Sequence, residues 1–357
     1  MKRRTVYFAA PRLVEFREET LPRLGADDVL VETICSAISA GTEMLVYQGR
    51  FPRDLETDSA ISSLRGGFEY PLAYGYACVG QVKDVGKSVN GNWIGRLVFA
   101  FQPHTSHFIT KPEALIAIPQ LLSPETACFL PNMETAVNLV QDGAPILGER
   151  VMVFGQGVVG LLTASLLGEF PLECLVVADC YERRRAAFDI ARASFKISHC
   201  ASVDPNDSEF RSKVFAASGF SFTDTGAASS GWPQTKFDLV YELSGNPAAL
   251  NEAISLTCFS GRIVIGSWYG EKKMPIDLGG SFHRSRIKMI SSQVSTITPE
   301  LSARWDKSRR FDVAWKALER IKPEKWITHR FSIKDADKAY QLLDENPQET
   351  IQILFEY

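Results

Sequence analysis

Three glycines at a fixed spacing are the residues of this 357-residue chain whose chemistry is easiest to assign. They lie in the stretch Gly155-Gln156-Gly157-Val158-Val159-Gly160. In such a stretch the first glycine permits a tight turn, the second lets the backbone approach a pyrophosphate, and the third lets a helix pack closely on a strand. The N–H groups of Val158 and Val159, at the start of that helix, would then face the phosphates.

Glycine triplets also arise at loop–helix junctions for packing alone, so the surrounding residues decide what the motif means. Residues 151–154 form an apolar strand pattern directly before it, and Asp179 ends the next strand pattern about 20 residues later. Asp179 is placed to bond the adenosine ribose hydroxyls and to repel a 2′-phosphate. The sequence therefore predicts a dinucleotide site that favours NAD. NADP stays possible, because one of the arginines at 183–185 could neutralise a phosphate if it turned inward.

The elements that must hold this motif alternate between strand and helix. We expect a helix at 158–168, a strand at 174–178, a helix at 183–193, and later strands at 237–242, 262–266 and 288–290. This alternation is typical of a parallel sheet covered on both faces. Before about residue 118, short strand patterns predict a β-rich domain instead. Residues 53–67 are expected to be a flexible loop, and residues 218–236 a flexible surface insertion.

Composition narrows the class of partner. The 39 basic and 42 acidic residues nearly balance, so there is no electrostatic case for nucleic acid or for an anionic membrane surface. No apolar run reaches the roughly 18 residues of a membrane-spanning helix. The 7 cysteines are odd in number and never form a Cys-x-x-Cys pair. These features favour a soluble, cytoplasmic protein that binds small molecules.

Over nearly its whole length the chain resembles the medium-chain dehydrogenase/reductase family, which includes zinc alcohol dehydrogenases and quinone reductases. The stretches that carry the resemblance are residues 40–43, 71–80, 155–160 and 242–245. The resemblance implies an α/β protein with a GroES-like catalytic domain at 1–132 and 297–357 and a Rossmann domain at 133–296. It also implies hydride transfer with a nicotinamide cofactor, and a homodimer.

The zinc ligands of that family are not matched. Ala40, Tyr76 and Pro131 occupy the three places of the catalytic zinc ligands, and the loop of four cysteines around the structural zinc is missing. None of these three side chains is a zinc ligand. His104 and His107 would need further ligands to form another site, and the alternative is that they are polar loop residues, with His104 near the substrate. The sequence therefore predicts a zinc-independent enzyme.

Candidate catalytic residues follow from the same resemblance. Thr42 matches the hydroxyl that bonds the reacting oxygen, although it could serve only to turn the chain. Tyr76 would place a phenol in the cleft as a hydrogen-bond or proton donor, or would only fill the space of the lost metal. Thr135 matches the threonine that contacts the nicotinamide.

Further candidates follow predicted strands at the carboxyl edge of the sheet, where ligands of such folds bind. Ser244, Gly266 and Ser267 are candidates for cofactor binding. Trp268 and Tyr269 could flank a flat substrate, or pack between domains or subunits instead.

A narrower resemblance, carried by residues 36–43 and 70–76, is to the zinc-lacking branch typified by bacteriochlorophyllide a dehydrogenase. Without a metal to stabilise an alkoxide, the substrate is expected to be a conjugated or otherwise activated alcohol or carbonyl compound. Three functions remain open: an NAD-linked dehydrogenase, a zinc-independent enone or quinone reductase, and a non-catalytic dinucleotide-binding protein.

Overall fold

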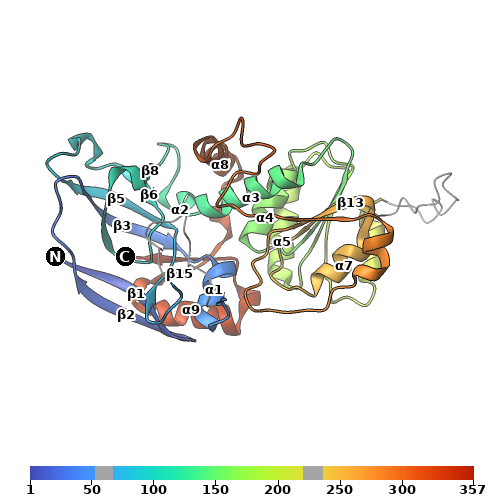
Figure 1. Cartoon of the computed structure of the whole chain (residues 1–357), viewed down its shortest axis with the longest axis horizontal. Helices are drawn as coiled ribbons and strands as arrows, with labels where there is room; N and C mark the ends of the chain where they lie inside the picture. Colours follow the sequence, from blue (N-terminus) through green and yellow to red (C-terminus); the bar gives the residue numbers. More distant parts are fainter. Residues whose placement is uncertain (53–66, 220–235) are drawn as a thin grey trace. The chain divides into compact units, whose positions relative to one another are not determined.

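The computed structural model describes residues 1–52, 67–219 and 236–357 (Figure 1). The loop expected at 53–67 and the insertion expected at 218–236 therefore lie almost wholly outside the described residues. The chain forms two compact units, Met1–Pro131 with Trp315–Tyr357, and Asn132–Ala314. Within the described residues, no helix combines the length and the apolar character needed to cross a membrane.

The first unit is built from two sheets whose strand pairs are antiparallel, except for the parallel pair of β15 and β16. A three-stranded sheet has the order β2-β1-β4, and a seven-stranded sheet has the order β15-β16-β3-β5-β6-β8, with β7 also pairing with β3. The strands are β1 Lys2–Ala10, β2 Leu13–Thr20, β3 Val29–Ala37, β4 Leu72–Ala73, β5 Cys78–Val85, β6 Leu97–Ala100, β7 His107–Thr110, β8 Leu115–Ala117, β15 Ile327–Ser332 and β16 Gln352–Glu356. The late strand β16 pairs with the early strand β3, so the last part of the chain completes this unit.

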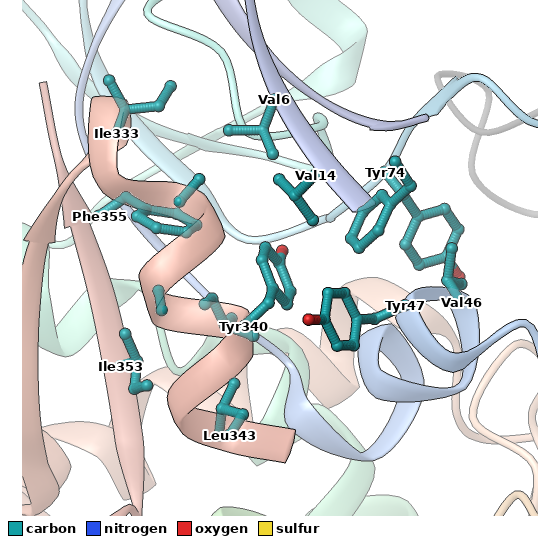
Figure 2. Packing of buried hydrophobic residues seen from close by; sticks show 14 of the residues in the cluster. Val6, Val14, Val46, Tyr47, Tyr74, Ile333, Tyr340, Leu343, Ile353 and Phe355 are labelled. Carbon is teal, nitrogen blue, oxygen red and sulfur yellow. The ribbon is translucent and has the colours of Figure 1, made fainter. Parts of the chain in front are cut away.

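A core of aromatic and aliphatic side chains packs two helices of this unit against its strands (Figure 2). Tyr340, on α9 (Ala336–Glu345), stacks on Tyr47 of α1 (Ala40–Gln48), with ring centroids 5.6 Å apart. The edge of its ring packs against Phe8 of β1 at 5.0 Å. Such aromatic pairs contribute about 0.5–1.5 kcal/mol beyond their buried area. The cluster thus fixes α1, whose first turn carries Thr42 and Glu43. A short helix, α2 (Pro124–Ala127), belongs to the same unit.

The second unit is a six-stranded parallel sheet with the order β11-β10-β9-β12-β13-β14. Its strands are β9 Arg150–Phe154, β10 Cys174–Ala178, β11 His199–Val203, β12 Phe237–Glu242, β13 Thr257–Ile265 and β14 Lys288–Ser291. Its helices are α4 Val158–Leu167, α5 Glu182–Ala191, α6 Phe210–Ala217 and α7 Ala249–Leu256 (Figure 1). Every residue of β10 is buried, as expected for a strand covered on both faces. The predicted α/β class with a Rossmann sheet is confirmed.

The two divisions between the units fall inside α3 (Leu130–Gly143) and α8 (Lys307–Ile321). The second division comes later than residue 297, where the resemblance placed it, because Arg310 is buried in the second unit. Its guanidinium pairs with Glu134 at 2.6 Å and also donates to the side chain of Asn138 and to the carbonyl oxygen of Thr296. These bonds tie the first turn of α8 to α3.

Candidate functional site

The glycine loop follows β9 directly and has the geometry that a dinucleotide requires. Gly155 has φ +90°, and a Cβ on it would lie 2.6 Å from the carbonyl carbon of Leu243. A Cβ on Gly160 would lie 2.0 Å from the carbonyl oxygen of Gly155. A Cβ on Gly157 would meet only Nη1 of Arg184, at 3.9 Å. The first and third glycines are therefore required by packing, whereas Gly157 borders open space that a pyrophosphate could occupy.

Strand order reverses next to this loop, because β10 lies on one side of β9 and β12 on the other. Ligands of open α/β sheets bind at the carboxyl ends of the strands at such a point. Here lies a hollow of about 690 Å³, bordered by the loops that follow β9, β10, β11 and β12. Its lining includes Gly155, Asp179, Tyr181, Arg184 and Ser244.

Asp179, directly after β10, is buried and holds two loops together. Its Oδ2 accepts a hydrogen bond from the backbone N–H of Gln156 at 2.6 Å, and its Oδ1 accepts one from the N–H of Tyr181 at 2.8 Å. The predicted ribose-binding carboxylate therefore also anchors the glycine loop. Residue types and spacing alone do not indicate this second task.

The three arginines that follow differ in where they point. Arg183 is exposed, and Arg185 donates to the carbonyl oxygen of Asp179 at 2.7 Å and pairs with Asp204. Arg184 lies over the ring of Tyr181, 4.7 Å from its centroid, and its Nη1 is 3.9 Å from Oδ2 of Asp179. One of the three thus turns toward the hollow.

The remaining predicted cofactor residues lie along the same edge of the sheet or on neighbouring helices. The hydroxyl of Ser244 bonds Glu242, and that of Ser267 accepts from the N–H of Gly245 at 2.9 Å, so both serines shape their loops. A Cβ on Gly266 would lie 2.5 Å from a methyl group of Leu139, so a larger residue there would require this side chain to move. Val158 and Val159 form the first turn of α4, and Thr135 is partly exposed on α3.

The two aromatic candidates for substrate binding differ in exposure. Trp268 is 36% exposed, and Tyr269 is partly buried with its hydroxyl bonded to Glu242. Burial and the neighbouring Glu242 raise the pKa of Tyr269, so its phenol stays protonated at neutral pH. The hydroxyl of Tyr269 is already bonded to Glu242, so the part of this side chain that could contact a substrate is its ring.

In the first unit, the places of the family's zinc ligands hold a pair of hydroxyls. Ala40 begins α1, and Pro131 is buried. Tyr76 is partly exposed, and its phenol donates a hydrogen bond to Oγ of Ser39, the residue before Ala40. Thr42 lies on the first turn of α1 and is partly exposed. No cluster of three His, Cys, Asp or Glu side chains suited to a metal occurs among the described residues. The side chains present do not fit a zinc ion.

The placement of His104 corrects its expected role near the substrate. His104 is fully buried, and both ring nitrogens are occupied: Nε2 lies 3.0 Å from Oε2 of Glu43, and Nδ1 lies 2.7 Å from Oγ of Ser36. Each ring nitrogen therefore has a hydrogen-bond partner, and which of them donates depends on the tautomer of the ring. The ring also packs edge-on against Phe355. His104 is therefore part of the interior and does not face a substrate.

Glu43 is the centre of this buried network, which sequence reasoning missed. Its Oε1 accepts from the N–H of Ser39 at 2.7 Å, and its Oε2 accepts from the phenol of Tyr340 at 2.5 Å. Ser36 also bonds the phenol of Tyr357 at 2.7 Å. Burial raises the pKa of Tyr340 and of Tyr357, so both phenols remain donors. The only signal in the sequence was an acidic residue four places after a serine at the start of a helix.

Comparison with known proteins supports the resemblance over the full length of the chain. No family model matches the sequence. The starvation-sensing protein RspB of Escherichia coli K12 is 22% identical over 99% of both chains. L-threonine 3-dehydrogenase of Xanthomonas euvesicatoria is 21% identical over 91% of both chains. The crystal structure of the alcohol dehydrogenase rspB from E. coli CFT073, in complex with NADH, superposes with a TM-score of 0.74 at 18% identity and covers 100% of this chain and 99% of its own.

Proposed function

We propose that this chain, which belongs to the medium-chain dehydrogenase/reductase family, is an NAD(P)-dependent oxidoreductase acting on an alcohol or carbonyl compound. The observation that carries the proposal is the open space beside Gly157, between two glycines that packing requires and next to the anchored Asp179. The NADH complex of the rspB structure and the dehydrogenase activity named for the Xanthomonas relative support the cofactor and the reaction class.

We propose further that the reaction needs no zinc. When bound, the nicotinamide supplies or takes up the hydride. The chain's own residues must then stabilise charge on the reacting oxygen. We propose the hydroxyl of Thr42 as a donor to this oxygen, and the phenol of Tyr76, which bonds Ser39, as the source of a proton. Because neutral donors stabilise an oxyanion less than a metal ion does, a conjugated or otherwise activated substrate is favoured. Trp268 is proposed to flank a flat substrate of this kind.

A second candidate function is that of a zinc-independent enone or quinone reductase. It is favoured by the side chains at 40, 76 and 131, which leave the substrate itself to delocalise the developing charge. In that reaction the hydride adds to carbon of a conjugated system and no alcohol is oxidised.

Binding of the cofactor is the first test of these proposals, because both proposed reactions require it. Gly157→Val is expected to abolish binding of NADH in a calorimetric titration, because the side chain would fill the space of the pyrophosphate. The fold should persist, because a Cβ there meets only the end of Arg184. Gly91→Val is the matched control, since a Cβ at Gly91 meets nothing within 4 Å, and it should bind NADH as the parent does. Equal binding by Gly157→Val would show that the glycine loop is not the cofactor site.

The reaction class is then separated by a screen of secondary carbinols and enones with either cofactor, followed by the absorbance of the reduced nicotinamide. Oxidation of a carbinol supports the dehydrogenase, and reduction of enones alone supports the second candidate. Binding of NADH without turnover of either class would indicate a non-catalytic dinucleotide-binding protein.

A further inference from the structure

Ser39 lies at the N-cap of α1, but its hydroxyl does not cap the helix. An N-cap serine normally accepts a hydrogen bond from a backbone N–H in the first turn. Ser123, the N-cap of α2, does so by accepting from the N–H of Thr126 at 3.1 Å. The side chain of Ser39 makes no such bond. The usual structural reason for a serine at this position is therefore missing.

The Ser39 hydroxyl instead accepts the hydrogen bond of the Tyr76 phenol. A hydroxyl that accepts one bond keeps its own proton for donation to another group. Ser39 and Tyr76 are both partly exposed. Two residues thus place two hydroxyls in series, one at the zinc-ligand position of Tyr76 and the other directly before that of Ala40.

Ser39 is held in place from the protein interior. Its N–H donates to Glu43, a fully buried carboxylate. The other oxygen of Glu43 is fixed by His104 and Tyr340, which are also fully buried. A buried carboxylate with its hydrogen bonds satisfied on both oxygens is a rigid support. This support fixes the backbone of Ser39 and leaves its hydroxyl to Tyr76.

We propose that Ser39 is a catalytic residue whose hydroxyl bonds the substrate oxygen and passes to it the proton supplied by Tyr76. This inference rests on the proposed function. In the direction of reduction, the carbonyl carbon takes the hydride from the reduced cofactor and the carbonyl oxygen takes the proton of Ser39. Ser39 regains a proton from the phenol of Tyr76, and the phenolate regains one from solvent. In oxidation each proton moves in the opposite direction. Glu43 and His104 are positioning residues.

Four variants of the full-length protein test the pair: Ser39→Ala, Ser39→Thr, Tyr76→Phe and the double variant Ser39→Ala/Tyr76→Phe. Each single loss of a hydroxyl is expected to lower kcat about 100-fold, as is usual for loss of a general acid or base. The double variant should lose about the same factor, because either change breaks the same relay. Ser39→Thr keeps the hydroxyl and should recover most of the rate. A solvent deuterium isotope effect on kcat should disappear in Ser39→Ala.

Ser123→Ala is the matched control, since it removes a serine that does cap a helix of the same unit. It should lower the melting temperature and leave kcat unchanged, whereas Ser39→Ala should change the melting temperature by less than about 2 °C. Parent-like kcat in Ser39→Ala, or multiplied losses in the double variant, would overturn the relay while leaving the proposed function intact. If the parent binds no nicotinamide cofactor or turns over no carbonyl compound, the proposed function itself fails.

Discussion

At the scale of single residues, the choice of cofactor depends on two opposite charges in one hollow. Asp179 disfavours a 2′-phosphate, and the sequence predicted a preference for NAD on this ground. This preference for NAD follows only if the neighbouring arginines remain solvated. In the structure Arg184 turns inward, 3.9 Å from the carboxylate, and reduces the repulsion that a second anion would meet.

Arg184→Ala should therefore weaken NADPH binding about tenfold, or roughly 1.4 kcal/mol, and change NADH binding by less than twofold. Arg183→Ala, an exposed neighbour on the same helical turn, is the control and should change neither affinity. Dissociation constants for both cofactors, measured by fluorescence titration in both variants, decide the matter. Equal losses for NADH and NADPH would mean that Arg184 supports the loop and does not read the ribose.

Residue types and spacing predicted the glycine loop and Asp179, because each glycine answers a local demand that recurs in every such loop. His104 was misplaced, because its partners come from distant parts of the chain. Ser36 of β3 and Glu43 of α1 bond its ring, and Tyr340 of α9 bonds the same Glu43, so the network needs all three elements to be packed together. A pattern of polar residues in a loop carries no information about such partners. Burial of a polar side chain becomes visible only with the tertiary structure.

At the scale of elements, a buried ion pair joins α3 to α8. Arg310 is fully buried and bonds Glu134, which precedes the candidate nicotinamide contact Thr135. Burial raises the pKa of Glu134, and the charge of Arg310 opposes this rise. The pair itself adds little net stability, but the loss of one partner leaves the other as an uncompensated buried group.

Arg310→Met should lower the free energy of unfolding by about 3–5 kcal/mol, because Glu134 loses its cation and keeps its burial. The double variant Arg310→Met/Glu134→Leu should recover a large part of this loss, since no charge then remains unpaired. Lys316→Met, at an exposed position of the same helix, should change stability by less than about 0.5 kcal/mol. Urea unfolding of these variants and of the single variant Glu134→Leu measures these differences. Stability losses that simply add in the double variant would show that the two side chains do not interact.

At the scale of the whole molecule, the order of the strands and helices was predictable from the sequence. The residues at which the two units divide were less predictable. Alternating strands and helices indicated the parallel sheet, and β9, β10 and β12 lie at or near the predicted residues, whereas β11 was not predicted. The end of the second unit was placed too early in the chain, because nothing in the sequence marks α8 as belonging to two units. The buried contacts of Arg310 with Asn138 and Thr296 lie within the second unit, and no local pattern contains them.

The last prediction is that the purified protein contains no stoichiometric zinc. Zinc in this family needs three protein ligands at the catalytic place, and Ala40, Tyr76 and Pro131 supply none. The nearby thiols of Cys78 and Cys128 do not replace them, because both are buried and no cluster of three His, Cys, Asp or Glu side chains suited to a metal occurs in the part of the chain that the structure describes. Elemental analysis should therefore find far less than one zinc ion per chain, and a chelator should leave turnover unchanged. One tightly bound zinc per chain, lost to the chelator together with activity, would contradict the metal-free mechanism and with it the roles given to Tyr76 and Ser39.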